Sequence, residues 1–261
     1  MYVPFVFIIF VSFLKDIDYS VWANFSLQNY SQLFSSVYFI IWGRSLALAS
    51  VTAVLCLAIA YPIAYFLVFR VARLRNILLF LLVLPFWANF LVQVYAWFFV
   101  LERGGILNSA LLKIGIISEP LRILNTQFSV YLVMLFCFLP FMVMPIYSSM
   151  EGINKSVFEA SFDLGANRWQ TLTRVVMPLS SSGIRTGFFL VFIPSFGEFV
   201  VPLLLGGGKN MYAGSLISFL FLETKSIEWG AAFTCLSGIV LIIAVFVFNW
   251  LLKKVFGTDR G

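Results

Sequence analysis

The residues that could carry out chemistry in this chain are few, and the commonest catalytic types are missing. The 261-residue sequence contains no histidine, which excludes serine–histidine and cysteine–histidine nucleophiles, HExxH zinc sites and haem ligation by histidine. The three cysteines, Cys56, Cys137 and Cys235, lie inside apolar runs and are expected to be small buried hydrophobic side chains. A nucleotide-binding GxxxxGK(S/T) loop is also absent, so we expect no catalytic residue, metal site or cofactor in this chain.

One carboxylate is notable for its position. Glu198 is the only acid inside the apolar segment 186–205 or any other predicted span. A charged side chain at the centre of a bilayer costs roughly 2.5–3.5 kcal/mol on insertion scales, so such groups usually face protein or a cavity. Pro194 would loosen the helix there, and Gly197 would let another backbone approach. Glu198 could therefore receive a protonated amine; the alternative is a hydrogen-bonded structural residue or a gate near the outer end.

A second candidate surface is polar and uncharged. Asn89, Gln93 and Trp97 recur at every fourth position, which places them on one stripe of a helix. Amide groups can bind the N–H groups of an amine, and a tryptophan ring can hold a cation over its face. We favour the alternative, in which the amides join neighbouring helices and Trp97 is an aromatic residue at the membrane interface.

A patterned polar segment, 151–183, separates two apolar runs. Ser156 and Glu159 have the S-x-x-E spacing of a capping box, which predicts a helix over 156–164. Gly165 then suits the left-handed position that ends a helix.

A second helix is predicted directly after this turn. Asn167 and Gln170 have the spacing of another cap, and Pro178 limits the helix that follows. The segment is thus expected to form a helical hairpin outside the membrane. It would either dock on a partner or lie on lipid headgroups through Arg168 and Arg174.

Membrane-spanning helices must position these residues, because the composition excludes a soluble domain. Hydrophobic residues make up 62% and charged residues 11%, against roughly 45–50% and about 25% in soluble proteins. The net charge of +6 is spread thinly, so we expect membrane lipid as a partner and no nucleic acid. Runs of the roughly 20 residues needed to cross a bilayer occur at 45–69, 76–101, 128–150, 186–205 and 229–252. With the shorter first run, 1–14, they predict an all-α polytopic membrane protein of about six helices.

The distribution of basic residues predicts the orientation. Arg70, Arg73 and Arg75 crowd the loop 70–75, which the positive-inside rule places in the cytoplasm. Alternation puts the hairpin and the C-terminal tail on the same side. The loops 15–44, 102–125 and 206–228 then lie outside, where bases are more dilute and accompanied by acids. Both termini are expected inside if the first run crosses.

The hairpin resembles the signature of ATP-binding-cassette importer permeases, E-A-A, x3, G, x9, I-x-L-P. The matching residues here are Glu159, Ala160, Ser161, Gly165, Val175, Val176, Met177 and Pro178. Ser161, Val175 and Met177 depart from the pattern but are conservative in size. The resemblance implies a type I importer permease fold, in which the first hairpin helix, from Ser156 onward, docks on a separate ATPase subunit.

Longer segments resemble the spermidine/putrescine importer permeases. They are LPFWAN at 84–89, VYAW at 94–97, LPFMVMPIYSS at 139–149 and FIPSFGEFVVP at 192–202. The similarity covers about 29–254 and is closest to the permease that carries the Gly-Glu-Phe-Val segment; the very short N-terminus departs from the family. It implies a channel subunit in a bacterial inner membrane, working with a homologous second permease, an ATPase dimer and a periplasmic or lipid-anchored polyamine-binding protein.

Other functions are weaker alternatives. The whole chain, 1–261, is expected to be one transmembrane domain that contains the hairpin 151–183. The same machine could carry iron, sulfate or another small solute, although Glu198 argues mildly against anions. A self-sufficient secondary carrier does not need the patterned hairpin, and the predicted spans lack charged pairs. A membrane-embedded enzyme would have little chemistry available.

Overall fold

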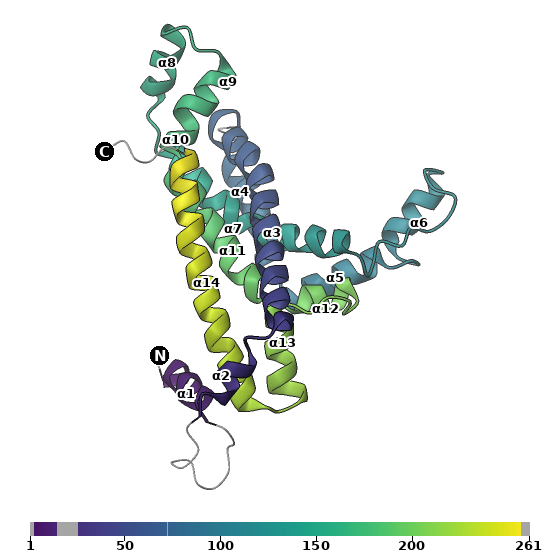
Figure 1. Cartoon of the computed structure of the whole chain (residues 1–261). Helices are drawn as coiled ribbons and strands as arrows, with labels where there is room; N and C mark the ends of the chain where they lie inside the picture. Colours follow the sequence, from purple (N-terminus) through teal and green to yellow (C-terminus); the bar gives the residue numbers. More distant parts are fainter. Residues whose placement is uncertain (1–2, 15–25, 72, 257–261) are drawn as a thin grey trace.

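The computed structural model describes residues 3–14, 26–71 and 73–256, and this part of the chain is helical and contains no strand (Figure 1). Helices are expected in lipid because every backbone polar group must be satisfied within its own segment. Four of the described helical segments are long and apolar enough to cross a membrane, or five if one bent pair counts as a single span. The all-helical membrane class is therefore confirmed.

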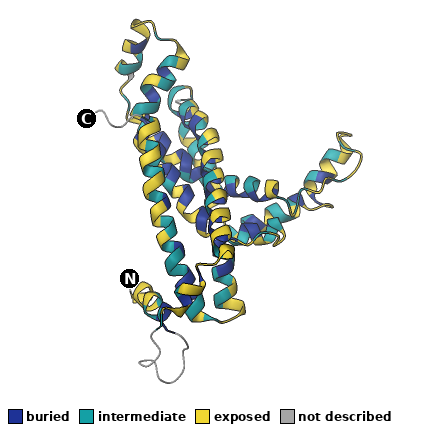
Figure 2. Ribbon diagram, viewed as in Figure 1, coloured by how far each residue is buried: buried dark blue, intermediate teal, exposed yellow. Residues whose placement is uncertain are grey.

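Three of the expected spans fold as long helices. These are α3 (Ser36–Phe69), α7 (Gln127–Glu151) and α14 (Ile227–Phe256). Helix α3 begins at Ser36 rather than at position 45, because the apolar run continues outward past Gly43 and Arg44. The core lies where α3, α7 and α11 (Ser181–Gly197) meet, with buried residues between the helices and exposed apolar residues on their outer faces (Figure 2).

Small residues let these helices approach closely. Ala49, Ala53, Ala60 and Ala64 of α3 are fully buried in the core. A Cβ atom built on Gly183 of α11 would lie 2.1 Å from the Ser149 Oγ and 2.4 Å from the Pro145 carbonyl oxygen of α7. Such backbone proximity is the usual basis of helix association in lipid, where apolar side chains gain little from leaving the solvent.

The expected span 76–101 is broken near Pro85. It forms α4 (Arg75–Val83), the short 3-10 helix η2 (Leu84–Trp87) and α5 (Phe90–Leu101), followed by α6 (Ile106–Lys113). Pro85 lies at the start of η2, where its missing N–H cannot continue the α-helical bonding. In Figure 1, α5 and α6 form an arm that projects away from the long helices.

The prediction of one continuous helix over 186–205 is wrong. Helix α11 ends at Gly197, and α12 (Val200–Gly206) begins after a break at Glu198 and Phe199. Glu198 is therefore not a mid-helix residue. Its backbone is extended, with φ −70° and ψ 128°, which ends the helical bonding of α11.

The remaining helices lie at the two ends of the long helices. At one end are the hairpin helices α8 (Lys155–Asp163) and α9 (Arg168–Thr171), the π-helix η3 (Leu172–Val176) and α10 (Met177–Leu179). At the other are α13 (Ala213–Ser218), the π-helix η4 (Phe219–Glu223), α2 (Gln28–Gln32) and α1 (Val3–Ser12) (Figure 1). Helix α1 packs on α14, and its 10 residues are too few to cross a hydrocarbon core of about 30 Å.

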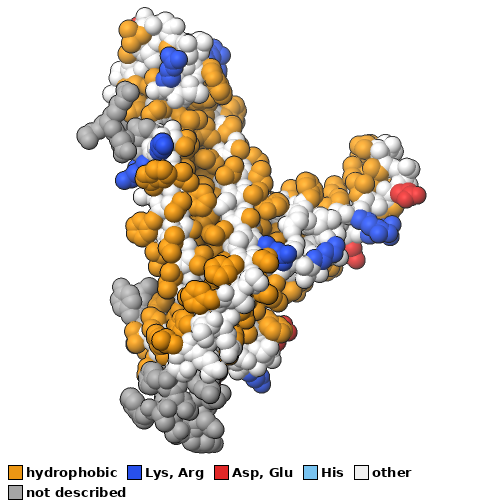
Figure 3. Space-filling model, viewed as in Figure 1, with side chains coloured by type: hydrophobic (Ala, Val, Ile, Leu, Met, Phe, Trp, Pro, Cys, Tyr) orange, Lys and Arg blue, Asp and Glu red, His pale blue; other side chains and the backbone are white. Residues whose placement is uncertain are grey.

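The grouping of loops predicted from charge agrees with the contacts. Arg75 at the start of α4 pairs with Glu151 at the end of α7, with 2.8 Å between Nη1 and Oε1. This ion pair places the loop 70–75 and the hairpin at one end. At the other end, the Lys209 ammonium donates to the Asn125 carbonyl at 2.9 Å, which joins the two loops expected outside. Exposed basic residues gather at the hairpin and along the arm (Figure 3).

Candidate functional site

The first hairpin helix begins at Lys155, one residue before the predicted range 156–164, and its cap lies two residues before the predicted one. Asn154, not Ser156, is the capping residue of α8, and its Oδ1 accepts the Ser156 N–H at 3.4 Å. The predicted capping box of Ser156 and Glu159 is therefore wrong, because Ser156 already lies inside the first turn. Glu159 and Ala160 are exposed on the helix, so neither is needed for packing within the hairpin.

The turn of the hairpin has the left-handed glycine that the sequence predicted. Gly165 has φ +79°, and a Cβ atom there would meet nothing within 4 Å. Its N–H donates to the Phe162 carbonyl at 2.9 Å, and the Ala166 N–H donates to the Ser161 carbonyl at 3.0 Å. These two bonds form a Schellman motif, which ends α8 by satisfying its last carbonyls. The glycine is required by backbone conformation, not by crowding.

The second cap is confirmed. The Asn167 Oδ1 accepts the Gln170 N–H at 2.8 Å, and the Gln170 Oε1 accepts the Asn167 N–H at 2.9 Å. Helix α9 continues through η3 into α10, which contains Pro178 and ends at Leu179. The chain then bends by 69° at Ser180 before α11. The proline removes a backbone donor near this bend, which weakens the helical bonding there.

One contact joins the two arms of the hairpin, and another attaches the hairpin to α3. The buried Ser161 hydroxyl lies 3.0 Å from the Thr171 hydroxyl, which joins the two arms. Serine in place of the family's alanine therefore adds a hydrogen bond. The Phe158 ring lies 4.5 Å from the Phe69 ring, between centroids, which connects α8 to the last turn of α3.

The far end of the hairpin is apolar and exposed. Leu164 is 88% exposed, Trp169 is 70% exposed and Phe162 is also exposed. Exposed apolar clusters on a protein surface often mark an interaction site. The hairpin thus combines a turn fixed by backbone hydrogen bonds, a hydrogen bond between its two arms and an exposed apolar tip, which are features suited to docking on a partner.

Glu198 lies at the break between α11 and α12 and caps the second helix. Its Oε1 accepts the Val200 N–H at 2.8 Å and the Val201 N–H at 3.3 Å. Both of these hydrogen bonds engage Oε1. The carboxylate can therefore cap α12 and still have an oxygen available for a further donor.

Residues that sequence analysis missed shape this break. A Cβ atom on Gly214 of α13 would lie 2.1 Å from the Gly197 carbonyl oxygen, so the backbone of α13 is in direct contact with the break. Ser45 of α3 accepts the buried Ala213 N–H on its hydroxyl at 2.7 Å and so satisfies the first turn of α13. The partners are far apart along the chain, so no local pattern in the sequence identifies either contact.

The polar stripe supports helix structure at a second break. The Asn89 Oδ1 accepts the Leu91 N–H at 2.9 Å and caps α5. The Gln93 amide donates to the Pro85 carbonyl at 2.6 Å and to the Ala88 carbonyl at 3.1 Å. The Pro85 carbonyl also accepts the Ala88 N–H at 3.1 Å, so Gln93 adds a second bond to this turn. Trp97 contacts the Phe136 ring edge-on at 5.2 Å. Among the described residues, no hydrogen bond, ion pair or ring contact joins these side chains to Glu198, so the structure does not bring the two candidate surfaces together.

Residues 1–256 match the family described as binding-protein-dependent transport system inner membrane component. The spermidine/putrescine transport system permease protein PotB of Salmonella typhimurium (strain SL1344) is 40% identical over 260 residues, covering 98% of this chain and 91% of that protein. PotB of Escherichia coli (strain K12) is 39% identical, with coverage of 98% and 94%.

A solved structure shares the fold. It is a bacterial ABC transporter involved in the import of the acidic polysaccharide alginate, with a TM-score of 0.74 and coverage of 98% of this chain and 90% of the other. The sequence identity is 14%, so this likeness concerns the fold alone.

Proposed function

The chain belongs to the family of binding-protein-dependent transport system inner membrane components, and from that premise we propose that it is the permease subunit of an ATP-driven polyamine importer. The relatives named for spermidine and putrescine transport are 39–40% identical over 98% of the chain, which supports this cargo class. The chain would work with a homologous second permease, an ATPase dimer and a polyamine-binding protein, and ATP hydrolysis would reside on the ATPase.

The observation that carries the coupling role is the closed hairpin with its exposed apolar tip. We propose that segment 151–183 docks on the ATPase, with α8 as the coupling helix. Ser156, Glu159 and Ala160 are exposed on α8 and available to a partner. Ser161 and Gly165 hold the turn, and Pro178 lies just before the bend into α11.

A series of contacts connects the hairpin to the break at Glu198. Through the contact between the Phe158 and Phe69 rings, a movement of α8 would displace α3. The outer part of α3 holds α13 through the Ser45 hydroxyl, and Gly214 of α13 abuts the carbonyl of Gly197. Closure of the ATPases would thus shift α3 and change the geometry of the break, since packed helices move as rigid elements.

Glu198 is the group proposed to meet the cargo. Its Oε1 is used by the cap of α12, and the second oxygen would accept an N–H of a protonated amine. Asn89, Gln93 and Trp97 were the other pathway candidates. Both amides are engaged in the helix break, so we propose that they support the pathway wall and do not bind the amine.

Reconstituted uptake tests the proposed function. The chain is purified with its second permease and ATPase, placed in liposomes and supplied with the cognate binding protein and ATP. We expect ATP-dependent accumulation of labelled spermidine or putrescine and no accumulation of sulfate or ferric iron. ATP-dependent uptake of one of the latter would replace the cargo but keep the machine. Uptake by the chain alone, without ATP or partners, would overturn the importer assignment.

Gly165→Val is expected to uncouple ATP hydrolysis from uptake, because valine resists the left-handed backbone at this turn. Nothing crowds the site, so the penalty is conformational, about 1–2 kcal/mol or more for a β-branched residue. Uptake per ATP hydrolysed should fall roughly tenfold, while the ATPase still copurifies.

Gly165→Asn is the matched control, because asparagine tolerates the left-handed conformation. It should keep most of the uptake. Equal behaviour of the valine and asparagine variants would show that the turn conformation does not control coupling.

A further inference from the structure

Arg185 places a positive charge inside a membrane-spanning helix. The sequence predicts that this span begins at 186, but α11 begins at Ser181 and includes Arg185. Gly187, two residues further along, lies against Met142 of α7, nine residues before α7 ends at Glu151. At a rise of 1.5 Å per residue, Arg185 therefore lies about 10 Å inside the end of α7.

No group among the described residues neutralises this charge. Arg185 forms no ion pair with an acid of the described chain, and the Nε of its partly buried side chain is buried and donates to no group there. A guanidinium carries a permanent charge and five N–H donors, and a buried donor without an acceptor is unfavourable. A charge at such a depth usually faces protein or a water-filled cavity. Arg185 is therefore expected to border a cavity and not lipid.

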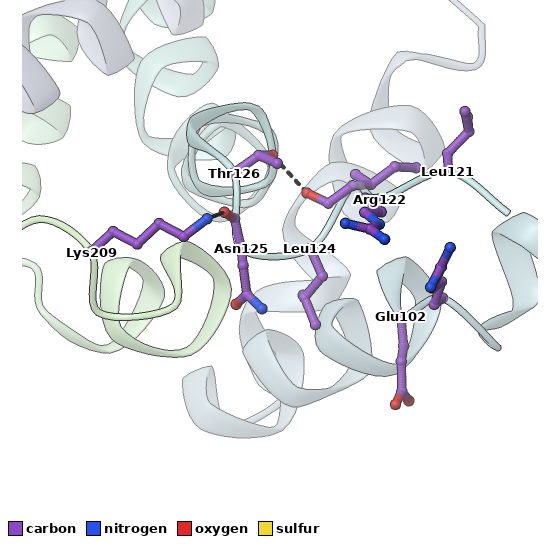
Figure 4. A pocket seen from close by; sticks show the side chains of 9 residues that line it. Glu102, Leu121, Arg122, Leu124, Asn125, Thr126 and Lys209 are labelled. Carbon is purple, nitrogen blue, oxygen red and sulfur yellow. Dashed lines mark hydrogen bonds between the residues drawn. The ribbon is translucent and has the colours of Figure 1, made fainter.

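Other basic side chains near the two ends of the spans have simpler surroundings. At the inner end, Arg75 pairs with Glu151. At the outer end, Arg122 and Lys209 are exposed at a pocket of about 500 Å³ (Figure 4), where water can solvate them. Arg185 differs from these groups because it combines partial burial with a position inside a span.

The exposed face of α11 that Arg185 borders is unlike a lipid-facing surface. Its exposed positions are Ser182, Thr186, Leu190, Ile193, Pro194 and Gly197. Four of these six are serine, threonine, proline or glycine, whereas the outward faces of α3 and α14 carry many valine, isoleucine, leucine and phenylalanine side chains. The same face leads to the break at Glu198. Its composition suits a pathway that contains water.

Two charges of opposite sign lie at the two ends of this face. Thirteen residues separate Arg185 from Glu198, which corresponds to about 20 Å along the helix axis. Glu198 would attract a protonated amine at the outer end, whereas Arg185 would repel it near the inner end. The separation exceeds twice the Debye length of about 8 Å at physiological ionic strength, so the two effects can be measured separately.

We propose that Arg185 is a specificity residue that lowers the affinity of the inward-facing pathway for cations. A polyamine that re-entered from the cytoplasm would meet a like charge, so the cytoplasmic pool would compete poorly with cargo arriving from Glu198. Arg185 does not drive transport, which requires ATP hydrolysis, but it limits rebinding and leak of released cargo. The inference rests on the proposed polyamine importer function.

The test uses the whole transporter in liposomes that contain ATP and a defined concentration of unlabelled spermidine. Initial uptake of labelled spermidine from outside is measured as the internal concentration is raised. We expect Arg185→Gln to reach half-inhibition at a roughly tenfold lower internal concentration than the wild type, because a repulsive charge is removed. The external half-saturating concentration is measured in parallel and should change less than the internal half-inhibition.

Further variants separate the charge of Arg185 from the packing of its side chain. Arg185→Lys keeps the charge and should keep the wild-type half-inhibition. Arg185→Gln/Thr186→Lys moves the charge to the neighbouring exposed position, and resistance to internal spermidine should return. Arg73→Gln removes an exposed base in the loop 70–75 and should behave like the wild type. Arg185→Met fills more of the same space and replaces Arg185→Gln if that variant fails to assemble with the second permease and ATPase.

Each outcome supports the barrier or overturns it. Equal half-inhibition of the wild type and Arg185→Gln would overturn it, and so would equal sensitisation by Arg73→Gln, which would indicate a general effect of surface charge. Loss of the second permease from both uncharged Arg185 variants would overturn the barrier and assign Arg185 to pairing between the permeases. Absence of ATP-dependent polyamine uptake by the wild type would reject the proposed function itself, a distinct result because it needs no variant.

Discussion

Glu198→Gln is expected to raise the half-saturating polyamine concentration by roughly ten- to a hundred-fold at matched membrane abundance. Glutamine keeps a side-chain oxygen that can cap Val200 and Val201, so the start of α12 should survive. The substitution removes only the charge. A charge-assisted hydrogen bond contributes about 1.5–3 kcal/mol, which sets the size of the effect. Uptake against concentration, measured in the reconstituted importer, gives the half-saturation point.

Glu198→Ala provides the comparison, because it removes both the charge and the cap. It should lower protein abundance as well as affinity, since loss of a helix cap costs about 0.5–2 kcal/mol. If Gln and wild type have the same half-saturation point while Ala lowers abundance, Glu198 is a capping residue alone. The preference for a cationic cargo would then rest on the relatives and not on this carboxylate.

Gly214→Ala is expected to prevent normal assembly of the outer end. The added methyl carbon would lie 2.1 Å from the Gly197 carbonyl oxygen and 2.8 Å from its carbonyl carbon. Both atoms belong to the backbone and cannot move by a rotamer change, so α13 must separate from the break. Overpacking of this kind costs about 1–3 kcal/mol or more. We expect a large loss of membrane abundance or of uptake, seen by immunodetection and transport assay.

Gly238→Ala is the matched control, because a Cβ atom at Gly238 in α14 meets nothing within 4 Å. Alanine favours the helix over glycine by roughly 0.5–1 kcal/mol, so this variant should match the wild type or exceed it. Full activity of Gly214→Ala would show that the backbone at Gly197 can move to accommodate the added methyl group. The direct contact between α13 and Gly197 would then have no mechanical role.

Gly214 and Glu198 both lie at the break between α11 and α12. Gly214 holds the backbone against Gly197, and Glu198 caps the next helix from the same break. A change in the position of α13 would alter the orientation of the Glu198 carboxylate. We therefore expect substitutions at Ser45, which holds α13 to α3, to affect cargo affinity even though Ser45 itself lies outside the break.

Local patterns determined a large part of this protein from the sequence alone. Long apolar runs specify spanning helices because lipid leaves the backbone no other partner. Gly165 and the Asn167–Gln170 pair specify the hairpin turn and the second cap, because each acts within a few residues of itself. The break before α5 also has a local cause, since the missing N–H donor is a property of Pro85 itself.

Where the sequence offers two equally good positions for a helix end, only the structure shows which one is used. Asn154 and Ser156 are both good capping residues two positions apart, and only the path of the chain out of α7 selects Asn154. Glu198 illustrates the same limit. A single apolar run contains both α11 and α12, and its hydrophobicity does not reveal where the backbone leaves the helix.

Contacts between distant segments were decided by tertiary structure. Three contacts join residues whose sequence neighbours give no sign of them: the Ser45 hydroxyl with the Ala213 N–H, Gly214 with Gly197, and the Asn108 amide with the Leu121 carbonyl. Periodicity and capping report on interactions within one turn of helix, about 5.4 Å. The surroundings of the break at Glu198 depend on which helices meet in space, and that is set by the close packing of α3, α7 and α11.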